Sequence, residues 1–337
     1  MTTSNYLPVR DEWLALGQEE ILEPALPIVD AHHHFYDRAD WVYLADDYSA
    51  DARSGHNVEA SVYMQALTRY RTGGSAEMKP VGETDYVVAA TSRNDGRLPQ
   101  IAKGIVGYAN LRCGAQVRDV LQSHIEAGMG RFRGIRHLTT WDAHPSLVNP
   151  LTAAPKGLLL DRTYRQGVAQ LQPLGLSYDA WLFFPQLPEL LDLAKEFAET
   201  KVIINHCGGI VRIGAYETRR AEIFDTWSKS MRELAALPNV YVKLGGLGMR
   251  INGFDFEKGV KPPSSQQLAD TWTPWMHTCI EAFGAQRCMF ESNFPVDKGS
   301  YSYATCWNAF KRLASGATPA EREALFKGTA SQVYRLA

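Results

Sequence analysis

Short apolar runs alternate with longer segments of helical periodicity along this chain of 337 residues. Such alternation is typical of βα units whose strands form a parallel sheet. We expect strands at eight segments: Pro27–His32, Val58–Gln65, Gly104–Ala109, Phe132–His137, Leu176–Phe183, Val202–His206, Val240–Leu244 and Cys288–Glu291. Eight parallel strands separated by helices close a barrel, so the pattern predicts a distorted (β/α)8 TIM barrel.

Helical spacing of apolar residues is clearest in the middle of the chain. The segment Leu187–Thr200 places Leu190, Ala194 and Phe197 on one face. Pro188 lies in the first turn, where its missing N–H costs no hydrogen bond. We therefore expect a helix over this segment.

Two more helices are expected towards the C-terminus. Thr318, with Glu321 three positions later, matches a capping box that starts a helix running to about Lys327. Trp272 and Met276 lie at helical spacing and fit a helix packed on the barrel better than a cofactor site.

The domain organisation follows from the loops. Tyr70–Thr84 and Asn252–Ser265 are rich in glycine and proline, and we expect them to be long loops that shape the pocket. No internal repeat or linker divides the chain. We expect an N-terminal extension over residues 1–24 and a single barrel domain over residues 25–337.

Charge and composition narrow the class of partner. Hydrophobic residues make up 45% of the chain and charged residues 21%, which is ordinary for a globular protein. The formal net charge is -2, so no global positive field attracts nucleic acid or anionic lipid. No apolar stretch approaches the ~18 residues of a membrane span. A small-molecule substrate is the expectation.

The cysteines and the N-terminus indicate the compartment. Five scattered cysteines, without a CxxC pair, predict neither a disulfide framework nor a thiolate zinc site. The segment Met1–Asp11 lacks a basic start followed by an apolar run, so it does not match a secretory signal. We expect a cytoplasmic protein. Barrels of this kind often pair, so a homodimer is one expectation.

Candidate chemistry begins at the end of the first strand. Period-2 alternation puts His32 and His34 on one face and His33 on the other. The sixth apolar run ends at His206, the corresponding position at the mouth of a barrel. Three neutral imidazoles and a water make a tetrahedral zinc shell, so His32, His34 and His206 are candidate ligands of a divalent metal.

Four motifs in order carry a resemblance. They are Ile28–His34, Ile204–Gly208, Tyr241–Gly246 and Met289–Asp297. With them the chain resembles the amidohydrolase-related branch of the amidohydrolase superfamily, in particular lactonases of the 2-pyrone-4,6-dicarboxylate lactonase type. The resemblance implies a distorted TIM barrel, a histidine cluster formed by His32, His34 and His206, and a carboxylate that closes strand eight. Family members hydrolyse lactones, amides or related esters, and some decarboxylate aromatic or unsaturated acids.

The sequence departs from the family where strand eight ends. Asn293 occupies the position at which the resemblance implies aspartate, and an amide cannot act as a general base. A zinc ion held by the histidines could make a base dispensable. Glu291 or Asp297 could replace the carboxylate, and Asp297 is preferred because a loop position reaches the mouth. The third alternative is a site without metal, in which imidazoles polarise the substrate.

Other polar and aromatic residues are expected to bind the substrate. Arg133 and Arg136 flank the fourth strand, and an arginine at the mouth would bind a substrate carboxylate through two parallel hydrogen bonds. The resemblance favours Arg136. Gln65 could orient a carbonyl or hydroxyl, and Trp181 could form a flat wall.

Three functions follow from these residues. The leading hypothesis is a hydrolase that opens a small carboxylate-bearing lactone, or a related ester or amide, with activated water. The alternative is a non-oxidative decarboxylase of an aromatic or unsaturated acid. The third is a barrel that binds a ligand without catalysis, which the loss of one expected carboxylate keeps open.

Overall fold

The centre of the molecule is a sheet of eight parallel strands. The computed structural model describes residues 6–39, 41–92, 99–148 and 154–336. The strands, in their order around the sheet, are β1 (Pro27–His33), β4 (Asn57–Met64), β5 (Gln100–Gly107), β6 (Phe132–Ile135), β7 (Ser177–Ala180), β8 (Val202–Ile204), β9 (Val240–Leu244) and β10 (Cys288–Phe290). All eight predicted strands are present, and the predicted TIM barrel is confirmed.

The sheet closes through residues that follow the last strand. His33 forms a parallel bridge with Phe294. The backbone N–H of Asn293 donates to the carbonyl of His32 at 2.9 Å, and that of His34 donates to the carbonyl of Phe294 at 2.8 Å. These bonds hold the segment after β10 against the histidine end of β1.

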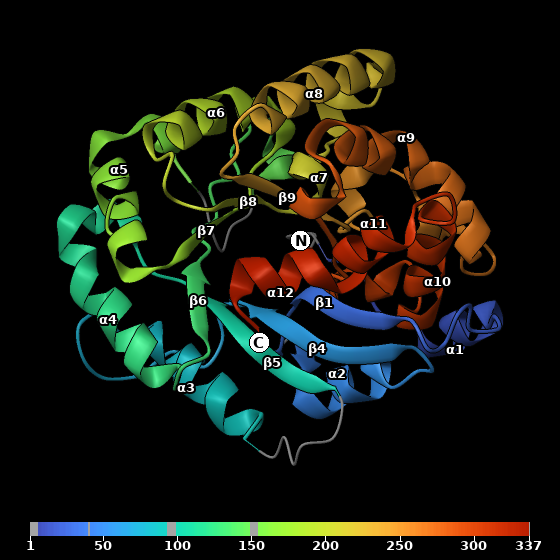
Figure 1. Cartoon of the computed structure of the whole chain (residues 1–337), viewed down its shortest axis with the longest axis horizontal. Helices are drawn as coiled ribbons and strands as arrows, with labels where there is room; N and C mark the ends of the chain where they lie inside the picture. The colour runs from blue at the N-terminus through green and yellow to red at the C-terminus, as the bar shows by residue number, and fades with distance from the viewer. Residues whose placement is uncertain (1–5, 40, 93–98, 149–153, 337) are drawn as a thin grey trace.

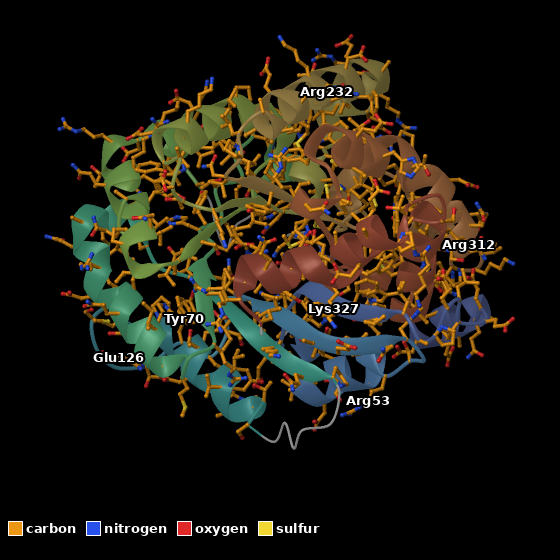
Figure 2. All side chains as sticks on the ribbon, viewed as in Figure 1. Arg53, Tyr70, Glu126, Arg232, Arg312 and Lys327 are labelled. Carbon is orange, nitrogen blue, oxygen red and sulfur yellow. The ribbon has the colours of Figure 1, made fainter. Side chains whose placement is uncertain are left out.

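Helices surround the sheet, as Figure 1 shows. They are α2 (Ala45–Ala52), α3 (Val81–Ala90), α4 (Arg118–Ala127), α5 (Arg162–Val168), α6 (Leu187–Glu196), α8 (Arg220–Ala235), α9 (Ser265–Phe283), α10 (Tyr303–Leu313) and α11 (Pro319–Glu323). Shorter elements are α1 (Asp11–Leu14), the single turn α7 (His206–Gly209) and the hairpin of β2 (Tyr36–Arg38) and β3 (Trp41–Tyr43). Charged side chains such as Arg232 and Glu126 lie on the outside of this helical layer (Figure 2).

The last helix, α12 (Thr329–Tyr334), closes one end of the barrel. Its Ala330, Val333 and Tyr334 join the apolar layer inside the strands. Arg133, near the start of β6, donates to the carbonyl of Tyr334. The helix therefore covers the ends where the strands begin, and the ends where they finish form the mouth.

Several element boundaries differ from the sequence predictions. β6 and β7 end at Ile135 and Ala180, because the chain leaves the sheet there to form the rim. Helix α3 begins at Val81, so the last part of the predicted loop Tyr70–Thr84 is helical. The helix that starts at the confirmed Thr318 capping box continues past Lys327 through a π-helical turn.

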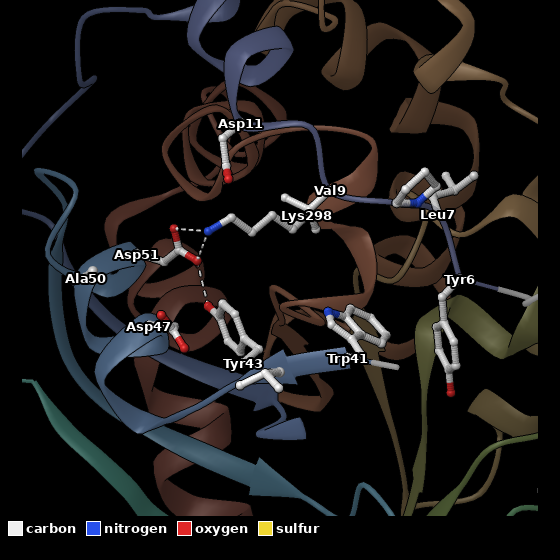
Figure 3. Close-up of a pocket in the computed structure, with 12 residues that line it drawn as sticks. Tyr6, Leu7, Val9, Asp11, Trp41, Tyr43, Asp47, Ala50, Asp51 and Lys298 are labelled. Carbon is white, nitrogen blue, oxygen red and sulfur yellow. Dashed lines mark hydrogen bonds and ion pairs between the residues drawn. The ribbon is translucent and has the colours of Figure 1, made fainter. Parts of the chain in front are cut away.

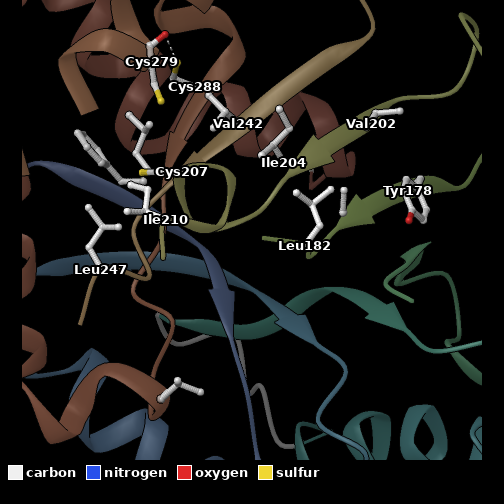
Figure 4. Packing of buried hydrophobic residues seen from close by; sticks show 14 of the residues in the cluster. Tyr178, Leu182, Val202, Ile204, Cys207, Ile210, Val242, Leu247, Cys279 and Cys288 are labelled. Carbon is white, nitrogen blue, oxygen red and sulfur yellow. Dashed lines mark hydrogen bonds between the residues drawn. The ribbon is translucent and has the colours of Figure 1, made fainter. Parts of the chain in front are cut away.

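The predicted helices over Leu187–Thr200 and around Trp272 are confirmed as α6 and α9, although α6 ends at Glu196. Buried hydrophobic residues pack in the layer between strands and helices (Figure 4), and Cys207, Cys279 and Cys288 are among them. All five cysteines are free. Within the described parts of the chain, no helix is long and apolar enough to cross a membrane. The first five residues of the expected N-terminal extension lie outside the described residues.

Candidate active site

The first strand delivers two histidines to the barrel interior. The ring centroids of His32 and His34 lie 4.8 Å apart, whereas His33 points to the other side and stacks on Tyr48 at 3.7 Å. Burial lowers the pKa of His33 to about 3, and its Nε2 pairs with the hydroxyl of Ser61. The expected alternation is therefore present, and His33 has a structural role.

His206 joins this pair from the turn that follows β8. Its ring centroid lies 4.6 Å from that of His32. The residue adopts a left-handed φ of 53°, which costs a non-glycine residue about 1 kcal/mol or more. Gly246 leaves room for the ring, because a Cβ there would lie 2.3 Å from Nδ1 of His206. The three histidines, separated in sequence, meet as expected.

Glu291 lies between two of these histidines. It follows β10 directly and is fully buried. Its Oε1 accepts from Nδ1 of His206 at 2.7 Å, and its Oε2 lies 2.8 Å from Nδ1 of His32. The structure thus brings Glu291 to the histidines, because its long side chain points inward from the end of the strand.

Asn293 and Asp297 lie behind this cluster. Asn293 donates from Nδ2 to Oδ1 of Asp297 at 3.0 Å. The other oxygen of Asp297 accepts from Tyr301 at 2.5 Å and from the N–H of Gly248 at 3.1 Å. Burial raises the pKa of Asp297 to about 7. In this arrangement Asp297 supports the loop after β10, and among the described residues it makes no hydrogen bond to a histidine, whereas Glu291 contacts two of them.

Of the two candidate arginines, only Arg136 reaches the cluster. Its Nη1 lies 3.0 Å from Nε2 of His32, and its Nη2 donates to the carbonyl of Gln65 at 2.8 Å. Arg133 is displaced from the mouth because it lies near the start of β6, where it binds carbonyls of Tyr334 and Arg335. Its expected contact with substrate therefore has no support in the geometry.

Gln65 and Trp181 both border the site. The side chain of Gln65 is 1% exposed, and among the described residues its Nε2 has no hydrogen-bond partner. Nε of Arg136 is likewise unpaired. Trp181 is half-buried and packs its edge on His206 at a centroid distance of 4.6 Å. Two donors thus remain available beside the histidines.

A buried ion pair beneath the cluster was missed by sequence reasoning. Nζ of Lys243 lies 2.9 Å from Oδ1 of Asp179, and both side chains are fully buried. Tyr334 of α12 donates to the same carboxylate at 2.7 Å. Burial lowers the pKa of Lys243, and Asp179 opposes that shift. A charged residue inside each of two predicted apolar strands was the signal that could have revealed this pair.

Asp30 is a second buried carboxylate that the sequence motif contained without assigning a role. It accepts hydrogen bonds from the hydroxyl of Ser292 at 2.6 Å and from Tyr48 at 2.9 Å. Tyr303 donates to the same oxygen at 3.1 Å. Burial raises the pKa of Asp30, and these donors oppose the shift. Asp30 thereby joins the histidine strand to the segment that carries Glu291.

Hydrogen positions at His32 expose a place for a cation. Nδ1 of His34 lies 2.9 Å from the carbonyl of Met64, so Nδ1 carries the hydrogen and Nε2 is an acceptor. Nε2 of His32 lies 3.0 Å from that acceptor, and its Nδ1 lies 2.8 Å from Glu291. Burial lowers the pKa of His32 well below its usual value, so the ring is neutral and has a single N–H. Nη1 of Arg136 donates to the same Nε2 of His32, so the ring hydrogen is on Nδ1. The contact between the Nε2 atoms of His32 and His34 therefore lacks a hydrogen, which a cation between them would replace.

The donor set fits a divalent metal ion. His32, His206 and Glu291 each offer one ligand atom, and these atoms lie within 4.8 Å of one another. Imidazole nitrogen and carboxylate oxygen are common ligands of zinc and related ions. Glu291 adds a carboxylate to the expected histidines, and Nε2 of His34, the third expected ligand, lies 3.0 Å from Nε2 of His32.

The amidohydrolase family model matches residues 29–336. The chain belongs to this family. This amidohydrolase is 34% identical over 296 residues to an uncharacterized protein of Sinorhizobium fredii, covering 87% of this chain and 86% of that protein. It is 27% identical over 325 residues to an L-fucono-1,5-lactonase of Burkholderia multivorans, covering 91% and 96%. A crystal structure of a Burkholderia multivorans amidohydrolase with bound zinc superposes with a TM-score of 0.71 at 26% identity, over 92% of this chain and 99% of that chain.

More distant structures share the fold alone. A Pseudomonas putida protein described as a 2-pyrone-4,6-dicarboxylic acid hydrolase has a TM-score of 0.62 at 17% identity, over 92% of this amidohydrolase and 98% of that chain. A 2,6-dihydroxybenzoate decarboxylase from Rhizobium has a TM-score of 0.57 at 12% identity, over 92% and 99%. The resemblance inferred from the four motifs is confirmed.

Proposed function

We propose that this amidohydrolase hydrolyses the ring ester of a small lactone that carries carboxylate or hydroxyl groups. The observation that carries the proposal is the meeting of His206, Glu291 and Arg136 at the mouth of the barrel, with unpaired donors beside them. The similarity to an L-fucono-1,5-lactonase over most of both chains supports a lactone as substrate.

Arg136 and Gln65 are the proposed substrate-binding groups. Nε of Arg136 and Nε2 of Gln65 are buried donors without partners among the described residues. A buried donor without an acceptor is costly, so a substrate oxygen that fills this place gains two hydrogen bonds. An anionic group gains most, because Arg136 is a buried cation. Trp181 would form one wall beside the ring.

His206 is the proposed general base. Glu291 accepts its Nδ1–H, which leaves a lone pair on Nε2. Burial lowers the pKa of His206, so the ring is neutral and able to take a proton. As water attacks the lactone carbonyl, Nε2 takes its proton, and Glu291 stabilises the resulting imidazolium. Cleavage of the ring C–O bond returns this proton to the leaving oxygen and yields a hydroxy acid.

A divalent ion, zinc in this proposal, would be held by His32, His206 and Glu291. When bound, it would polarise a carbonyl and lower the pKa of water to about 7. His206 cannot serve as metal ligand and general base through the same lone pair. Elemental analysis of the purified protein before and after chelation, paired with activity, separates the two arrangements.

The test of function is acid release from lactones. L-fucono-1,5-lactone and a set of carboxylated lactones are incubated with wild type and His206→Ala. The control is His277→Ala, at a histidine of α9 whose Nε2 contacts the carbonyl of Leu313 at the end of α10. We expect turnover by wild type and the control, and a loss of at least about 100-fold in His206→Ala. Carbon dioxide release from aromatic acids in place of lactone opening would instead establish a decarboxylase, and binding without turnover would establish a non-catalytic barrel.

A further inference from the structure

The N-terminal segment Tyr6–Gly17 is here called the arm, and Figure 3 shows its Tyr6, Leu7, Val9 and Asp11 around a pocket that Trp41 and Lys298 also line. Nε1 of Trp13 donates to the carbonyl of Gly259 at 2.9 Å, and Arg10 donates to that of Glu257 at 2.6 Å. Both acceptors lie in the long loop between β9 and α9. Arg10 and Trp13 of the arm are thereby hydrogen-bonded to a loop at the rim of the barrel.

The tip of the arm crosses the loop that follows β10. Leu7 lies directly over Gly299, where an added Cβ would come within 2.5 Å of the Leu7 Cβ. Only glycine permits this approach, so the loop that contains Asp297 and the arm are fitted to each other. The arm therefore has a defined path towards the mouth.

An aromatic series connects the arm to the histidines. The ring of Tyr6 lies 4.9 Å from that of Trp41 and 6.1 Å from that of Tyr36, measured between centroids. Tyr36 stacks on Trp41 at 4.5 Å and lies 5.5 Å from His34. Tyr6 is thus separated from a histidine of the site by a single side chain.

The Tyr6 phenol is also an electrostatic neighbour of Arg136. Burial lowers the pKa of the Arg136 guanidinium, while the phenols of Tyr36 and Tyr6 act in the opposite direction. The same guanidinium has the unpaired Nε that a substrate oxygen would fill. The arm therefore brings a phenol into the electrostatic surroundings of the substrate-binding cation, on the side where Tyr36 lies between Tyr6 and His34.

A hollow of about 710 Å³ lies between the arm and the β2–β3 hairpin. Polar side chains that border it pair with one another, since Lys298 lies 2.7 Å from Asp51 and Tyr43 donates to Asp51 at 2.6 Å. The middle of the arm thus borders open space.

We propose that Tyr6 is a substrate-contacting residue, supplied by the arm, whose hydroxyl hydrogen-bonds the part of the lactone that Arg136 holds. The inference rests on the proposed lactonase function and adds a specificity determinant from outside the barrel. A lactone with a hydroxyl or carboxylate at that position would bind more tightly than one without it.

Kinetics of three variants test the contact. In Tyr6→Phe we expect KM for L-fucono-1,5-lactone to rise by about five- to tenfold, the loss of one hydrogen bond, with kcat changed less than about twofold. Gly299→Ala displaces Leu7 and should raise KM in the same way. Leu16→Ala, at a 63% exposed position of the same arm, should match wild type. Wild-type KM in Tyr6→Phe would overturn the contact and leave the lactonase function standing.

Proteolysis provides a readout that does not depend on turnover. Trypsin cleavage after the exposed Arg10 is followed by mass spectrometry, with and without saturating L-fuconate, the product of opening that lactone. We expect the ligand to slow this cleavage at least about threefold in wild type, in line with a contact worth ~1 kcal/mol, and not in Tyr6→Ala. If wild type opens no lactone, the proposed function is wrong. The effect of L-fuconate on the rate of cleavage after Arg10 is then the test of the Tyr6 contact. Equal cleavage with and without ligand in wild type would overturn it.

Discussion

Glu291 accepts the Nδ1 hydrogen of His206 at 2.7 Å, although the two residues are 85 positions apart in the chain. The N–H of His206 also donates to the same oxygen at 3.0 Å. One carboxylate thus fixes both the backbone and the ring of His206, and it determines which ring nitrogen is available for chemistry.

Replacing Glu291 by glutamine should separate its charge from its shape. The amide retains an acceptor for His206 but cannot stabilise an imidazolium or serve as an anionic metal ligand, so we expect kcat to fall about 100-fold or more. The melting temperature should change little by comparison. Glu199→Gln, at an exposed carboxylate, is the matched control. Wild-type kcat in Glu291→Gln would contradict the assigned role.

Arg136→Lys should weaken substrate binding. Lysine cannot reproduce the fork that joins His32 and the carbonyl of Gln65, so we expect KM for carboxylated lactones to rise by about tenfold or more. Arg133→Lys is the comparison, because Arg133 binds the carbonyls near the C-terminus. It should lower the melting temperature and leave KM unchanged. If Arg133→Lys raised KM and Arg136→Lys left it unchanged, Arg133 would be the substrate ligand.

Gly246→Ala should disturb His206 directly. The added Cβ would lie 2.3 Å from Nδ1 of His206, and the backbone φ of 66° disfavours alanine. We expect a loss of about 1–3 kcal/mol in the free energy of unfolding and a fall in kcat that exceeds what lower stability explains. Gly73→Ala has open space around it and serves as the control. Denaturant unfolding and steady-state kinetics measure both effects.

Asp297 should make the protein less stable as the pH rises. Burial raises its pKa from 3.8 to about 7 in the folded protein. Between these values the folded state keeps the proton and the unfolded chain has lost it, so the unfolding free energy falls by up to about 1.4 kcal/mol per pH unit from this group. This contribution is fully favourable below the unfolded pKa and is lost as the pH rises through that interval.

Asp297→Asn removes this titration, so its unfolding free energy should decline less steeply between about pH 4 and pH 7 than that of wild type. Guanidinium titrations at a series of pH values measure the difference in slope. Glu83→Gln is an independent comparison, because burial raises the pKa of Glu83 to about 7 as well. Parallel curves for wild type and Asp297→Asn would show that Asp297 is ionised in the folded protein throughout.

Local patterns predicted the fold well because each strand carries its own signal. The apolar runs that end at His32 and His206 are strands flanked by helical segments, and eight of them in succession have few alternatives to a closed barrel. Alternation along β1 also predicted that His32 and His34 share a face, since side chains of a strand alternate whatever the partner strand is.

The sequence by itself determined the barrel, the inward pair His32 and His34, and the place of His206, because these depend on periodicity and strand order. Only the tertiary structure decided that Glu291 meets the histidines and that Arg136 reaches them while Arg133 does not. Contacts between residues so far apart depend on how the sheet closes and on how far each side chain extends beyond its strand. They also depend on the position of α12, which covers the end of the barrel where Arg133 lies. Local hydrophobic spacing records none of these.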